Sequence, residues 1–81
     1  MKTIGLVGGT GWVSTVEYYR IINEEINRIT GGTDFAKCIL FSLNYGEIDS
    51  FNKKNNPAGV YSLINDAAIK LIDAGAECIL L

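Results

Sequence analysis

Several features are scarce in this sequence of 81 residues, and each scarcity argues against a class of protein. No segment approaches the roughly 18 consecutive apolar residues that a membrane span needs, so we expect no membrane partner. The seven lysines and arginines are scattered, with only Lys53 and Lys54 adjacent, and no basic stripe suggests a nucleic-acid partner. A single proline and the lack of low-complexity segments argue against a disordered chain.

Cysteine is also scarce, with one residue in each of two apolar runs. Cys38 lies in A-K-C-I-L-F and Cys78 lies in A-E-C-I-L-L. We expect both to be buried, reduced structural thiols, since a free cysteine packs as a small hydrophobic residue, and we assign neither a catalytic role. Met1-Lys2-Thr3 leads directly into a strand-like run without the layout of a signal peptide, so the expected compartment is the cytosol.

Hydrophobic residues make up 48% of the chain, and their spacing predicts alternating strands and helices. The predicted strands are Thr3–Val7, Ala36–Leu43 and Ala76–Leu81. The predicted helices cover about residues 15–30 and 57–74, with a short helical turn around Glu47–Phe51. We expect the second strand to be buried on both faces because it is almost entirely apolar.

Local signals place the helix ends. Ser14-Thr15-Val16-Glu17 has the pattern of a capping box, with a hydroxyl residue followed three positions later by glutamate. Gly31-Gly32 is typical of a helix stop. Asn56 before Pro57 predicts the start of the second long helix, and Gly75 its end.

The order β-α-β-α-β indicates a single α/β domain with a three-stranded parallel sheet and right-handed crossovers. Three strands and two helices are half of a doubly wound, flavodoxin-like domain. The last predicted strand runs to Leu81 with nothing after it to cover the sheet. We therefore expect residues 1–81 to be the N-terminal part of a longer α/β domain; the alternative is a complete miniature domain, which so short a chain stabilises less easily.

The stretch I-G-L-V-G-G-T-G-W-V-S at residues 4–14 places a glycine-rich loop between the first strand and the first helix. Ligands of open parallel sheets bind beyond the carboxyl ends of the strands, where this loop lies. A dinucleotide-binding loop needs a third glycine where Ser14 stands, and a carboxylate after the second strand, which instead ends in Ser42-Leu43-Asn44. A small anion needs only backbone N–H groups and the positive end of a helix. A third interpretation is a tight turn with no ligand.

The opening of the chain resembles the aspartate/glutamate racemase family, in its aspartate racemase-like branch. That branch begins M-K-T-I-G-L-I-G-G-M-S-W-E-S-T, followed two residues later by Y-Y-R. The matching positions are Met1–Leu6, Gly8, Gly9, Trp12, Ser14, Thr15, Tyr18, Tyr19 and Arg20. The likeness continues through Gly31-Gly32, Glu47-Ile48 and the D-A-A…A-G-A segment at residues 66–76.

The resemblance implies an amino-acid racemase, an isomerase that uses no pyridoxal phosphate, metal or nucleotide. In this family a pair of cysteines faces the substrate's α-carbon from opposite sides; one thiolate removes the α-proton and the other thiol returns a proton. The first catalytic cysteine would fall just past Leu81, and the second comes from the other half of such a protein. The chain alone is therefore expected to be inactive.

The resemblance also implies a substrate site. Gly9, Thr10 and Gly11 would offer backbone donors to an amino acid such as aspartate or glutamate, with the Thr10 side chain facing the pocket. Asn52, or alternatively Lys53 or Lys54, would lie near the substrate's distal carboxylate. No catalytic residue and no metal ligand is expected within the chain.

Three positions depart from the branch, and other assignments stay open. Thr10 replaces a methionine and Val13 a glutamate, which bears on substrate choice. Gly11 replaces a serine, a mild change because other branches have glycine there. The expected assembly is a homodimer. One alternative is a fragment of an NAD(P)-dependent Rossmann reductase or epimerase, and another is a non-catalytic dimerisation module.

Overall fold

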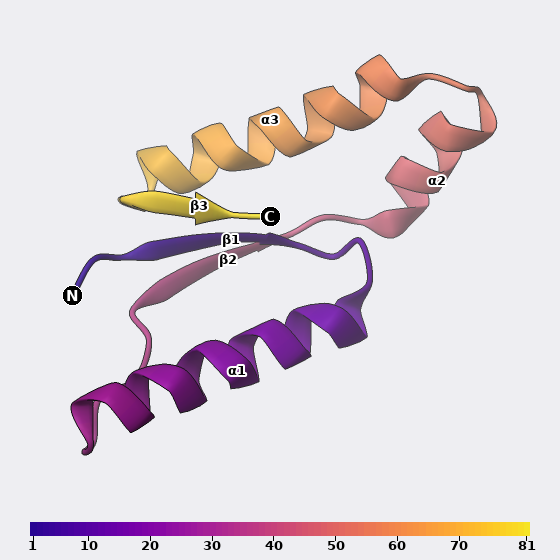
Figure 1. The fold of residues 1–81 in the computed structure, drawn as a ribbon. Helices are drawn as coiled ribbons and strands as arrows, with labels where there is room; N and C mark the ends of the chain where they lie inside the picture. The colour runs from indigo at the N-terminus through magenta and orange to yellow at the C-terminus, as the bar shows by residue number, and fades with distance from the viewer.

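Three parallel strands form a sheet in the order β2-β1-β3 in the computed structural model, which describes residues 1–81. The strands are β1 (Ile4–Gly8), β2 (Cys38–Ser42) and β3 (Cys78–Leu80), and the helices are α1 (Trp12–Thr30), α2 (Tyr45–Lys53) and α3 (Pro57–Asp73). α1 lies on one side of the sheet and α3 on the other, with α2 beside the start of α3 (Figure 1). The predicted α/β class with a doubly wound parallel sheet is confirmed.

The register of the parallel strands gives the sheet an amino end and a carboxyl end with different residues. Ile4 of β1 pairs with Cys38 on one side and Cys78 on the other, so both cysteines lie at the amino end of the sheet. Gly8 pairs with Ser42 at the carboxyl end. The loop that leads into α1 and the connection to α2 both leave from this carboxyl end (Figure 1).

Asparagine side chains cap α2 and α3 at their N-termini. Asn44 Oδ1 accepts a hydrogen bond from Gly46 N at 3.1 Å, and Asn56 Oδ1 accepts one from Gly59 N at 3.1 Å. The predicted start of α3 is confirmed. The short turn predicted around Glu47–Phe51 is instead the nine-residue helix α2, because the Asn44 cap lets it begin earlier.

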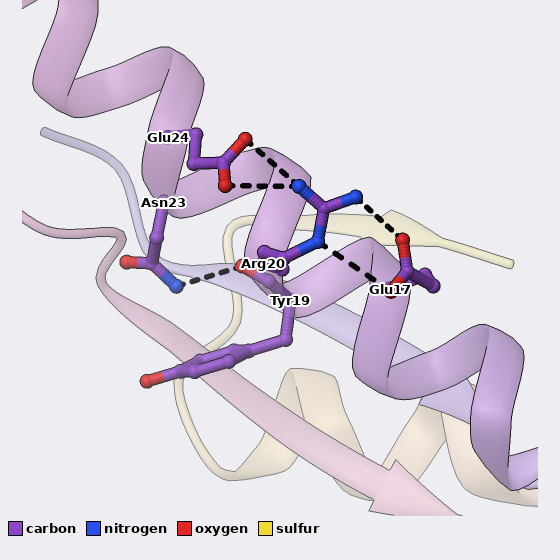
Figure 2. Close-up of polar contacts among 5 residues, drawn as sticks. All are labelled: Glu17, Tyr19, Arg20, Asn23 and Glu24. Atoms are coloured by element: carbon purple, nitrogen blue, oxygen red, sulfur yellow. Dashed lines mark hydrogen bonds and ion pairs between the residues drawn. The ribbon is translucent and has the colours of Figure 1, made fainter.

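The predicted capping box of α1 is wrong. The helix begins at Trp12, three residues before the predicted start, and its N-cap is Gly11, which provides no side-chain hydrogen bond. Ser14 therefore lies inside the first turn. Glu17 bonds Arg20 rather than the backbone, with Arg20 Nη2 2.5 Å from Glu17 Oε2 (Figure 2).

The core lies mainly between the sheet and α3, with α2 packed on α3. Leu71 and Ala67 of α3 are almost completely buried, and Ile48 of α2 is 5% exposed. On the opposite face only Leu6 of β1 is a buried apolar side chain, and α1 contributes no buried residue. The α1 side of the sheet is therefore thinly covered.

This asymmetry corrects two predictions about burial. β2 is not buried on both faces: Leu40 is 50% exposed, and no residue of the strand is fully buried. The thiols are not both buried either, since Cys38 is half-buried and Cys78 is exposed. Both errors have one cause. β2 and β3 are the two edge strands of the sheet, and α1 does not cover the face of these strands that carries Leu40, Cys38 and Cys78.

None of the three helices joins sufficient length to sufficient apolar content for a bilayer crossing. No group of three or more histidine, cysteine, aspartate or glutamate side chains converges in a way that could hold a metal ion.

Candidate functional site

A tight loop at residues 9–11 joins the carboxyl end of β1 to α1. Gly9 adopts a φ of 89°, in the left-handed region that favours glycine. A Cβ at this position would lie 2.1 Å from the carbonyl oxygen of Leu43, so the loop can pass against the end of β2 only with glycine there. Leu43 N donates to Gly8 O at 2.7 Å and fixes the two segments together.

Gly8 brings the first turn of α1 close to the sheet. A Cβ on Gly8 would lie 2.7 Å from Thr15 Cγ2 and 2.8 Å from Thr15 Oγ1. This is the close packing of helix on strand that a dinucleotide-binding loop obtains from its third glycine. Here the close contact is between Gly8 and Thr15. The serine at position 14 therefore does not prevent the first turn of α1 from packing on the end of β1.

The backbone donors of the loop divide into used and unused groups. Gly9 N donates to Thr15 Oγ1 at 3.2 Å, and Thr15 N donates to Gly11 O at 3.1 Å. Between them, the N–H groups of residues 10–14 have no acceptor within the chain, because the first residues of a helix have no carbonyl one turn before them. Five successive N–H groups are thus available at the positive end of α1, an arrangement that suits a small anion.

The charges around this helix end do not compete for those donors. The first turn of α1 contains no acidic residue. The first carboxylate along the helix, Glu17, is bound by Arg20, whose hydrogen bonds and positive charge lower the pKa of Glu17. Arg20 also bonds Glu24, with Nη1 2.9 Å from Oε1, and its guanidinium lies between the two carboxylates in Figure 2. This ion-pair cluster keeps the side-chain charge of α1 on the helix surface and neutralises part of it.

The structure brings three of the four predicted substrate-binding residues together. Gly9, Thr10 and Gly11 form one turn, in which Gly9 is buried and the other two are exposed. Asn52 lies at the opposite end of α2 from Asn44, about 10 Å along the helix axis from its first residue. Its exposed side chain makes no hydrogen bond to the loop. Lys53, the predicted alternative, is paired with Asp49 at 2.9 Å.

Two residues of the site were not predicted as such. Thr15 binds the glycine loop through its hydroxyl, and Leu43 packs its backbone on Gly9. A threonine four residues after an N-cap can bond that residue's carbonyl, but the sequence placed the N-cap at Ser14 instead of Gly11, so this signal for Thr15 was missed. No sequence signal pointed to Leu43, since its contact depends on the register of β1 and β2.

Both thiols lie far from this loop. Cys38 and Cys78 are the first residues of their strands, four positions before the level of Gly8, which corresponds to about 13 Å along a strand. They flank Ile4 at a separation of two strand spacings, about 9.6 Å, which is too far for a disulfide between them. Both are free. Neither thiol can reach a group bound at residues 10–14.

No family model matches the chain. A search of solved structures finds strong similarity to a crystal structure described as a "putative Asp/Glu Racemase from Yersinia pestis". The matched segments, which cover 98% of this chain, are 43% identical and superpose with a TM-score of 0.94. The chain spans 34% of the length of that protein. The resemblance to the Asp/Glu racemase family is confirmed over this segment.

Proposed function

We propose, from the similarity to an Asp/Glu racemase together with the run of unused N–H groups after β1, that this chain supplies one edge of the substrate site of a cofactor-independent amino-acid racemase. It is the N-terminal part of the α/β domain of such an enzyme. The substrate is aspartate, glutamate or a similar amino acid. One observation carries the proposal. In this segment, which is similar to a racemase, the N-terminus of α1 has no side-chain cap and lies at the carboxyl end of the sheet.

The loop's part in the reaction is to hold the substrate carboxylate. Racemisation begins when a thiolate takes the α-proton, and it ends when a thiol on the opposite face gives a proton to the same carbon. Negative charge moves onto the carboxylate between these steps. The N–H groups of residues 10–14 are fixed donors beside that charge, and fixed donors stabilise a developing charge more effectively than water does.

The thiols that move the proton lie outside this chain. Cys38 and Cys78 lie at the amino end of the sheet, opposite the end where the glycine loop lies. A racemase of this type needs two thiols at one carbon of its substrate. We therefore expect the 81-residue chain to bind an amino acid without racemising it. Circular dichroism of L-aspartate incubated with the purified chain measures this, and steady loss of optical activity would contradict the assignment of the thiols.

Substrate choice belongs to the side chains around the loop. Thr10 and Val13 stand where the family branch has methionine and glutamate, and both are exposed beside the unused donors. A neutral residue at position 13 removes a negative charge from the first turn, which favours binding of a second carboxylate on the substrate.

The direct test is a titration of the ¹⁵N-labelled chain followed by NMR. L-aspartate, D-aspartate and L-glutamate are expected to shift the amide signals of residues 10–14 and to leave α3 unchanged. NAD⁺ is the comparison ligand for the dinucleotide alternative. Shifts at the loop with NAD⁺ and none with the amino acids would overturn the proposal, as would amino-acid shifts confined to another surface.

The compartment and the assembly are further parts of the proposal. The two free thiols suit a reducing compartment, which supports the cytosol. The exposed aromatic residues of α1 support a homodimer, since large apolar side chains grouped on one helix are typical of an interface. These exposed residues are Trp12, Tyr18 and Tyr19.

A further inference from the structure

Thr15 joins the two ends of the glycine loop through one hydroxyl group. Its Oγ1 accepts a hydrogen bond from Gly9 N at 3.2 Å and donates one to Gly11 O at 3.4 Å. A threonine hydroxyl has one proton and two lone pairs, so both bonds can form at once. Between these partners, Gly9 and Gly11, lies Thr10, one of the residues expected to bind the substrate.

The Thr15 side chain is fixed on its other side as well. Its Cγ2 and Oγ1 fill the space that a side chain at position 8 would occupy, so the hydroxyl is held at the loop by packing against Gly8. Thr15 is half-buried, whereas Ser14 and Val16 on either side of it are exposed. Packing and hydrogen bonding therefore select the same orientation of this side chain.

We propose that Thr15 is a positioning residue of the carboxylate site, which holds the loop at residues 9–11 in its binding conformation and takes Gly9 N–H out of the set of ligand donors. This inference rests on the proposed function. The substrate donors are the N–H groups of residues 10–14, and Gly9, which the sequence resemblance offered as a donor, acts through the shape of the loop and not by contact with the carboxylate.

The role of the hydroxyl can be separated from that of the methyl group. Thr15→Val keeps the shape of the side chain and removes the hydroxyl, which leaves the buried Gly9 N–H without an acceptor. Thr15→Ser keeps the hydroxyl and removes the methyl group. The matched control is Thr30→Val, because Thr30 Oγ1 also bonds the carbonyl four residues before it on α1, Ile26 O at 3.0 Å, with no contact to the loop.

The experiment measures amide hydrogen exchange and aspartate affinity by NMR on the full 81-residue chain and its three variants. We expect Thr15→Val to exchange Gly9 N–H about tenfold faster and to bind aspartate about tenfold more weakly, the size of one lost hydrogen bond. Thr15→Ser is expected to restore both values, and Thr30→Val to change neither. Urea unfolding of each variant confirms that the comparison is between folded chains.

The outcomes distinguish this inference from the proposed function. If the unmodified chain binds no amino acid, the proposed function fails, and the positioning role fails with it as a role in binding. If the chain binds aspartate and Thr15→Val binds it equally well, the inference is overturned while the proposed function stands. Unchanged exchange of Gly9 N–H in Thr15→Val overturns the inference in either case. If Thr15→Val does not fold, Thr15→Ser decides, because a serine that binds aspartate weakly despite its hydroxyl contradicts the role given to Oγ1.

Discussion

At the scale of the residue, two glycines of one loop differ in how strictly the fold requires them. Gly9 is required by its positive φ and by the carbonyl of Leu43, which leaves no room for a side chain. Gly11 has an extended backbone with φ −157°, and its nearest neighbour for an added Cβ is Ser14 Oγ at 3.6 Å. The sequence shows four glycines within seven residues but not which of them the fold needs, because the difference depends on the path of β2.

This difference predicts unequal effects of two similar substitutions. Gly9→Ala is expected to lower the free energy of unfolding by more than about 2 kcal/mol, since the strained φ alone costs of order 1–3 kcal/mol and the contact with Leu43 adds to it. Gly11→Ala is the matched control; because Gly11 is the N-cap of α1, where alanine is less favoured than glycine, a smaller loss of at most about 1 kcal/mol is expected. Urea denaturation of both variants measures the difference, and equal loss of stability would contradict the described path of the loop.

A second glycine is explained by packing between helices. A Cβ on Gly59, in the first turn of α3, would lie 2.3 Å from Cδ1 of the Phe51 ring on α2. Gly59→Ala is therefore expected to destabilise the chain, although alanine is favoured over glycine in a helix by about 1 kcal/mol.

A double-mutant cycle tests that expectation. Phe51→Leu removes the ring, so Gly59→Ala is expected to cost less in the Phe51→Leu background than in the original chain. Urea unfolding of the four chains gives the coupling. Additive effects of the two substitutions would show that Phe51 does not lie on Gly59.

At the scale of the element, the helices differ in how they are held. α2 and α3 have asparagine caps and share the buried core, so the sequence signals for α3 were sufficient to predict it. α1 has neither a side-chain cap nor a buried residue. The pattern at residues 14–17 indicated a capping box, but Glu17 is drawn to Arg20, and a sequence does not show which of two partners a carboxylate takes.

Ion pairs on the outer surface of α1 make the stability of this helix depend on pH. Arg20 lowers the pKa of Glu17, and Arg28 lowers that of Glu25, in each case through hydrogen bonds first and charge second. A carboxylate with a lowered pKa in the folded state contributes stability above its unfolded pKa, here 4.5, and loses that contribution as the pH falls through the folded value.

The corresponding experiment compares the original chain with the double variant Glu17→Gln and Glu25→Gln. The original chain is expected to have more α1 helix at pH 7, and the difference should shrink below pH 4.5 and disappear once the pH is below the lowered pKa values of Glu17 and Glu25. Both pairs are exposed, so added salt should reduce the difference at pH 7. Far-UV circular dichroism follows the change. A difference that persists in acid would exclude the ion pairs as its cause.

At the scale of the whole molecule, the chain is more open than a compact domain of its length. Its radius of gyration is 14.4 Å, and a compact chain of 81 residues has a value of about 12 Å. Cavities of about 280 and 410 Å³ lie between α1 and the sheet, one beside β3 and one beside β2. Figure 1 shows α1 running along one side of the sheet, opposite α3. The alternation of strands and helices predicted the fold class, but not this openness, because apolar periodicity gives the face of a helix and not what covers it.

The open side of the sheet predicts self-association of the isolated chain. Tyr18 and Leu80 line the cavity beside β3 and are about half exposed, as are Tyr19 and Leu40 in the cavity beside β2. Sedimentation velocity is expected to show a dimer that forms with increasing protein concentration. Tyr18→Ser with Tyr19→Ser should shift that equilibrium toward the monomer, with Tyr61→Ser, an exposed residue of α3, as the control. A monomer at every concentration would contradict the homodimer.

A crystal structure of the chain with L-aspartate decides whether successive N–H groups at the start of α1 hold the carboxylate of an amino acid. We expect a carboxylate oxygen within hydrogen-bond distance of N–H groups from residues 10–14, with Gly9 N–H still bonded to Thr15. Aspartate bound away from this loop, or a dinucleotide seated on it in a parallel crystal, would show that the loop does not hold an amino-acid carboxylate.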